Sequence, residues 1–127
     1  MQFVVLHHTG WPGRADHYDL MLQFAAGKSD DDRVLSTFAT IEDTFPSGQP
    51  PTKLQRIEDH RRAYLTLEGK LSGNRGVISR IDSGALFYIG QASNEVTEFE
   101  LRGTKLTGRF RITRLKAIYS FEKIDTQ

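Results

Sequence analysis

Short segments in which apolar and polar residues alternate follow one another along almost the whole chain, separated by glycine-rich or polar turns. A period of two is typical of strands with one face in a core, because successive side chains point to opposite faces. The turns recur roughly every ten residues, a spacing typical of small antiparallel barrels and sandwiches. Strands are therefore expected over 2–8, 16–24, 33–41, 52–58, 63–68, 76–82, 85–90, 95–101, 105–112 and 116–124.

This pattern favours a mainly β fold, a small closed or nearly closed antiparallel β-barrel with short flanking helices. No segment carries three turns of helical periodicity, and short helical pieces are expected only near 42–45 or 59–63. The chain has 127 residues, which is enough for one hydrophobic core. We therefore expect a single domain over 1–127.

The composition excludes several kinds of site. The chain has no cysteine, so disulfides, thiolate metal sites and cysteine nucleophiles are ruled out, and any metal must bind nitrogen and oxygen. Its net charge is only +1, so contact with nucleic acid is expected to be weak and local. The N-terminal residues lack the basic region of a signal peptide, and no apolar stretch approaches the roughly 20 residues that cross a bilayer. A cytoplasmic monomer without a membrane partner is expected.

Histidines and one aspartate form the first candidate site. In the strand expected at 16–24, His17 and Asp19 lie on one face, opposite a mostly apolar set. An antiparallel neighbour near the N-terminus could add His7 or His8, and alternation does not choose between them. Two imidazoles and a carboxylate suit Mn, Zn, Fe or a similar divalent ion. The alternative is an ordinary polar strand face in solvent.

A second candidate site follows in the middle of the chain. Glu58 and His60 share a strand face, and Tyr64 comes four residues later. A histidine held in one tautomer by a carboxylate can donate to a phosphoryl oxygen, whereas the alternative is a charged turn with a core tyrosine. The turn at 73–76 could offer backbone N–H groups and the Arg75 guanidinium to an anion, or could simply be a hairpin turn that needs glycine.

A basic stretch lies near the C-terminus. It could make a shallow contact with a phosphate backbone, but a solvated strand face is the simpler interpretation. It comprises Lys105, Arg109, Arg111 and Arg114.

Several motifs occur in order along the chain: Phe-Val-Val-x-x-His at 3–8, His-Tyr-Asp-Leu-x-Leu at 17–22, Glu-Asp-His-x-x-x-Tyr at 58–64 and Glu-Gly at 68–69. Together with the glycine-bearing hairpin at 101–110, they resemble the 3′-phosphoesterase domain family of bacterial DNA ligase D. The resemblance covers nearly the whole chain, and it is closest to the short stand-alone members.

The resemblance implies roles for particular residues. The metal of the family, typically manganese, is held by residues matching His8, His17 and Asp19, which implies His8 rather than His7 as the second histidine. The residues matching His60 and Tyr64 contact the scissile phosphate, and the glutamate matching Glu58 supports the site. The activity implied is removal of 3′-phosphates and 3′-ribonucleotides from DNA ends before end joining, with a separate DNA ligase as a candidate partner. The family fold, a β-barrel with small flanking helices, agrees with the strand pattern.

The chain also departs from the family pattern. Met21 stands where the family has a phosphate-binding arginine, and a lysine expected after the third strand is replaced near Glu42. A further family arginine aligns with 52–53. Arg56, expected on the face of Glu58 and His60, and Arg75 are the candidates to replace the lost phosphate contacts. The alternative function is a catalytically weakened metal- and phosphate-binding module that recognises nucleic-acid ends.

Overall fold

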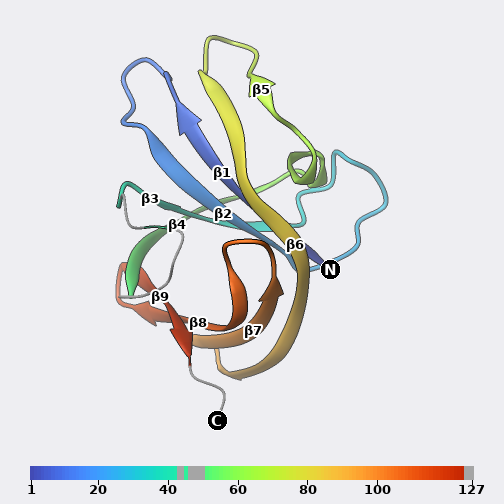
Figure 1. Cartoon of the computed structure of the whole chain (residues 1–127), viewed down its shortest axis with the longest axis vertical. Helices are drawn as coiled ribbons and strands as arrows, with labels where there is room; N and C mark the ends of the chain where they lie inside the picture. The colour runs from blue at the N-terminus through green and yellow to red at the C-terminus, as the bar shows by residue number, and fades with distance from the viewer. Residues whose placement is uncertain (43–44, 46–50, 125–127) are drawn as a thin grey trace.

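The computed structural model describes residues 1–42, 45 and 51–124 (Figure 1). The elements in order are β1 (Gln2–Thr9), β2 (His17–Gln23), β3 (Leu35–Thr40), β4 (Thr52–His60), the 3-10 helix η1 (Arg62–Leu65), β5 (Gly69–Lys70), β6 (Val77–Ser93), β7 (Val96–Arg102), β8 (Thr107–Leu115) and β9 (Ile118–Ile124). Within these described residues, no helix has the length and apolar character needed to span a membrane.

All strand pairings are antiparallel, and they form one sheet that curls into a ring. The order is β1, β2, β3, β4, β9, β8, β7, β6 and β5, and β6 also pairs with β1. In the described part of the chain, eight strands thus form a nearly closed ring, while the short β5 lies outside it against β6. Curling removes most open sheet edges, which would otherwise invite aggregation. The predicted mainly β, nearly closed antiparallel architecture with a short flanking helix is confirmed.

One predicted strand, 63–68, is wrong. Its first residues form η1, which agrees better with the helical piece expected near 59–63. The acidic loop before β3 fixes this turn, because the amides of Arg62 and Ala63 donate to the carbonyls of Asp32 and Asp30 at 2.8 and 3.0 Å. Alternation alone could not reveal these distant backbone partners. The other expected helical piece, near 42–45, lies partly outside the described residues.

The strands expected at 76–82 and 85–90 are not separate, because β6 runs through residues 82–84 without interruption, so the predicted break between them is wrong. The strand pairs with β1 up to Ala85 and with β7 from Ala85 onward, so the break is a bend that passes the strand from one neighbour to the next. Gly84 is required there, since a Cβ atom would collide with the carbonyl oxygen of Arg102. The buried Asp82 carboxylate accepts the amide hydrogens of Ser83 and of residues 104–106 at 2.7–2.9 Å.

Both faces of β1 and β2 are covered, and this buries the candidate site. The larger apolar cluster fills the ring and includes Phe3, Val5, Leu20 and Leu22. A second cluster lies on the outer face, where η1 and the segment after it pack over the strands. It comprises Val4, Leu6, Met21, Val34, Leu35, Tyr64 and Ile78, flanked by Leu65, Leu67 and Leu71.

Candidate metal centre

Strand register decides between the two N-terminal histidines. His8 lies directly opposite His17 across β1 and β2, and Leu6 lies opposite Asp19. His7 points to the other face, where its ring stacks on Tyr18 with 4.3 Å between ring centroids. His8 and His17 therefore share the face of Asp19.

His8, His17 and Asp19 converge in a group that could hold a metal ion, because their ligand atoms all lie within 4.8 Å of one another. The Oδ2 atom of Asp19 is 3.4 Å from Nε2 of His17 and 4.0 Å from Nδ1 of His8. All three residues are buried, with 6%, 5% and 3% exposed in chain order. A solvated polar face, the alternative from sequence, does not describe them.

Backbone carbonyls hold the outward nitrogens of both imidazoles. Nε2 of His8 lies 2.6 Å from the carbonyl oxygen of Arg75, and Nδ1 of His17 lies 3.0 Å from that of Ala15. A carbonyl oxygen only accepts, so each of these nitrogens carries the hydrogen. The rings then present their other nitrogens toward Asp19, the arrangement that orients histidine ligands in metal sites.

The electrostatics of the group fit a cation. The hydrogen bond to Asp19 raises the pKa of His17, so a cation at this nitrogen competes with a proton. The other carboxylate oxygen of Asp19, Oδ1, is buried and finds no hydrogen-bond partner among the described residues. An unpartnered buried oxygen is costly, and a metal ion would supply the missing partner.

A cavity of about 190 Å³ adjoins the three candidate metal ligands, and residues of the second candidate site also line it. His60 and Tyr64 line it, with the two rings edge to face at 4.9 Å. Burial lowers the pKa of His60, which favours its neutral form. The remaining lining comprises Leu6, Trp11, Arg14, Ile57, Glu58, Leu71, Arg75 and Ile78.

Glu58 acts on His60 through its backbone. The carbonyl oxygen of Glu58 lies 3.0 Å from Nδ1 of His60, which holds the ring in the tautomer with its lone pair on Nε2. The Glu58 side chain is 83% exposed and lies 3.9 Å from Arg33. The expectation that a carboxylate orients His60 is therefore wrong, and a carbonyl does so instead.

Arg56 does not lie on the face of His60, contrary to the sequence-based expectation. A bulge in β4 sets Ile57 opposite Thr37 but His60 opposite Leu35, so alternation breaks between them. Arg56 instead packs over the Phe38 ring at 5.3 Å. Its guanidinium pairs with Asp59 at 2.6 Å, and Arg56 is not among the described residues lining the 190 Å³ cavity.

Two other arginines do reach this cavity. Arg75 was a candidate from sequence, and its guanidinium donates to the Ser72 carbonyl oxygen at 2.8 Å. Arg14 was missed, because the loop between the first two strands signals only a turn. Its guanidinium lies 4.9 Å above the Trp11 ring, which in turn stacks on His8 at 5.2 Å.

Met21 lies two residues beyond Asp19 on the same face, but it is 1% exposed and belongs to the outer apolar cluster. It is not among the described residues that line the cavity.

No family model and no curated protein matches the chain. The functional argument therefore depends on the geometry of the site and on the ordered motifs of the sequence.

Proposed function

We propose that the protein is a metal-dependent 3′-phosphoesterase, similar to the phosphoesterase domain of DNA ligase D, that acts on the 3′ ends of DNA. Its reaction would remove a 3′-phosphate or a 3′-ribonucleotide during end repair. The observation that carries this proposal is the buried group of His8, His17 and Asp19 beside a cavity lined by His60 and Tyr64. One carboxylate oxygen of Asp19 has no hydrogen-bond partner among the residues that the structure describes. The proposal that the substrate is a phosphoester depends on the ordered motifs of the sequence.

Manganese is the ion we propose, because two imidazoles and a carboxylate suit it and the resembling family typically uses it. Zinc and other first-row ions suit the same ligands and belong in the same assay. A bound divalent ion would polarise a phosphoryl oxygen and lower the pKa of a coordinated water.

The chain's own residues would position the phosphate and move protons. Arg14 and Arg75 supply positive charge at the cavity, in place of the arginine that Met21 replaces. His60, held by the Glu58 carbonyl, would accept or return a proton at Nε2. The Tyr64 hydroxyl would donate to a phosphoryl oxygen as charge develops there.

The test is an assay with Mn²⁺ and a labelled primer-template that ends in a 3′-phosphate or a 3′-ribonucleotide. We expect product from the wild-type protein, none from His17→Ala and a large loss in His60→Ala. His7→Ala is the matched control, because it removes a histidine of the same strand from the wrong face, and it should retain activity. Equal activity in His17→Ala and wild type would contradict the proposal.

The second candidate is a binding module that keeps the metal and the phosphate contacts but has lost turnover. The buried Met21 favours it, since the family's phosphate-binding arginine has no direct replacement on β2. Metal-dependent binding of the 3′-phosphorylated primer-template without product would support this module. Absence of both binding and product would overturn both candidates.

A further inference from the structure

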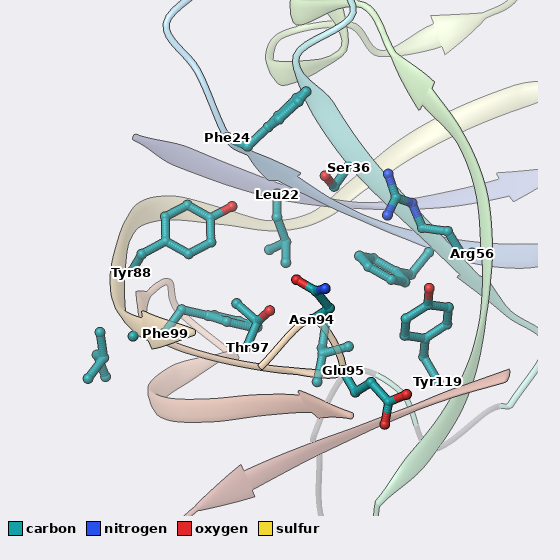
Figure 2. Close-up of a pocket in the computed structure, with 14 residues that line it drawn as sticks. Leu22, Phe24, Ser36, Arg56, Tyr88, Asn94, Glu95, Thr97, Phe99 and Tyr119 are labelled. Carbon is teal, nitrogen blue, oxygen red and sulfur yellow. The ribbon is translucent and has the colours of Figure 1, made fainter. Parts of the chain in front are cut away.

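A second and larger cavity, of about 470 Å³, opens at the ring interior (Figure 2). Its apolar wall consists of inward residues of the ring, Leu22, Phe38, Phe99 and Ile112, which are at most 5% exposed. Its rim includes Phe24 and Tyr88, each 44% exposed. This volume is in the range of small-molecule sites, which combine apolar walls with a few polar groups.

The cavity is separate from the candidate metal centre. The 470 Å³ cavity uses residues of the inner cluster, whereas the 190 Å³ cavity uses Leu6, Tyr64 and Ile78 of the outer cluster. A ligand in the ring would therefore bind independently of a metal ion.

Polar groups from several strands surround the apolar wall. Figure 2 shows the Asn94 amide within the cavity and the Tyr119 hydroxyl directed toward the Arg56 side, with Thr97 nearby. Ser36 adds a hydroxyl from β3. These groups include both donors and acceptors, so they match a ligand whose edge also carries both.

The charges on the lining balance. Arg56 and Glu95 carry opposite charges, and the guanidinium of Arg56 is already paired with Asp59 at 2.6 Å. A ligand with a strong net charge inside the cavity would disturb this balance. The guanidinium carbon of Arg56 lies 5.3 Å from the centre of the Phe38 ring. A guanidinium and an aromatic ring are both suited to stack on a flat ring.

We propose that this cavity binds an uncharged planar heteroaromatic ring of the nucleobase kind, inserted between the aromatic rim and the apolar wall of the ring. The apolar wall would take up the faces of the ligand, and the hydroxyl, amide and guanidinium groups would bond to its edge. Stacking of bases on aromatic and arginine planes is the common mode of such recognition. The base could belong to a free nucleoside or to a nucleic-acid strand.

The test is titration of the metal-free protein with adenosine and with single-stranded hexadeoxyadenylate. Binding is monitored by amide NMR shifts and by calorimetry. We expect saturable one-to-one binding of at least one probe, with shifts concentrated in β3, β6 and β7. Thr97→Phe fills the cavity from β7 and should weaken binding about tenfold or more. Ser36→Leu, which narrows the cavity from β3, should do the same if Thr97→Phe fails to fold.

Thr113→Phe is the matched control, because it makes the same substitution on β8 next to the inward Ile112, on the outer face of the ring. It should leave binding unchanged, as should His17→Ala at the candidate metal centre. Binding of adenosine would assign a nucleoside site, and binding of the hexamer alone would assign a strand site. Binding of neither, or binding that both cavity-filling variants leave intact, would overturn the proposal without affecting the phosphoesterase assay.

Discussion

The Oδ1 oxygen of Asp19 is buried without a partner among the described residues, and this makes a prediction about stability. An ion that binds only the folded state at a concentration of 100 Kd adds about 2.7 kcal/mol to the free energy of unfolding. For a chain of this size, the melting temperature should rise by roughly 10 °C with Mn²⁺. Asp19→Asn should abolish that rise but change the metal-free melting temperature little, and thermal melts with and without Mn²⁺ measure both.

His7→Ala is the control for this experiment. It should keep the full rise with Mn²⁺, because His7 lies on the opposite face of β1. A rise of equal size in Asp19→Asn and wild type would mean that the ion binds elsewhere.

The hydroxyl of Tyr88 predicts how the stability of the fold changes at alkaline pH. Tyr88 is 44% exposed overall, but its hydroxyl is partly buried where it donates to the Gln23 carbonyl at 3.2 Å, and this burial raises its pKa from 10.0 to about 12. The unfolded chain therefore loses this proton before the folded chain does. The stabilising contribution of the hydroxyl is complete below pH 10 and declines as the pH rises toward about 12.

The comparison of wild type with Tyr88→Phe isolates this effect. The variant should be less stable below pH 10, and the difference in the free energy of unfolding should shrink as the pH approaches about 12. Urea unfolding at both ends of this range is the measurement. A difference that stays constant with pH would show that the hydroxyl does not titrate between the two states.

Alternation predicted which residues share a face only where the strand is unbroken. His17 and Asp19 lie two apart in an unbroken strand, and alternation placed them on one face. The choice of His8 over His7 came from the family resemblance, because alternation cannot give the register of β1 against β2, which depends on long-range pairing. Arg56 was misplaced because a bulge in β4 shifts the alternation, and Arg14 was missed because loops have no periodicity.

At the scale of an element, the close approach of the long strand β6 to β7 requires one glycine, Gly84. A Cβ atom at Gly84 would collide with the Arg102 backbone, whereas a Cβ at Gly90 of the same strand meets no atom of the described part of the chain within 4 Å. Gly84→Ala should therefore lower the free energy of unfolding by about 2 kcal/mol or more. Gly90→Ala should be neutral or slightly stabilising, because it restricts the unfolded chain.

Chemical denaturation of the two variants measures this contrast. A loss in Gly90→Ala equal to that in Gly84→Ala would mean that flexibility of the strand, and not close approach to β7, explains the requirement for glycine.

Most strands were predictable because they alternate and are bounded by turns. The two failures have different causes. Polar residues and glycine signal a turn whether or not the chain reverses. At 82–84 they serve a bend, in which the Asp82 carboxylate accepts amide hydrogens from the loop before β8. At 63–68 the alternation was real, but backbone bonds to Asp30 and Asp32 favoured a 3-10 turn.

At the scale of the whole molecule, two apolar clusters on opposite faces of β1 and β2 explain why the candidate metal centre is buried. The sequence indicated the inner cluster, since one face of each strand is apolar. It did not indicate the outer one, because Leu65, Leu67 and Leu71 cover β1 and β2 only after η1 has folded back over them. Burial of a polar site by a distant segment cannot be read from local periodicity.

At the scale of the whole molecule, the low net charge predicts that oligonucleotide binding depends only weakly on salt concentration. The net charge is +1, and Arg14 and Arg75 are the cations among the described residues that line the 190 Å³ cavity. If these two side chains make the phosphate contacts with a single-stranded 3′ end, the slope of log K against log salt should be about −1.4. Affinity for a 3′-phosphorylated oligonucleotide should then fall only about sevenfold between 50 and 200 mM salt.

Arg14→Ala and Arg75→Ala should each reduce the slope by about half, and Arg109→Ala on β8 should not. Fluorescence anisotropy at several salt concentrations measures the slope. A fall in affinity of about a hundredfold or more over the same salt range would mean that a wider basic surface binds the strand.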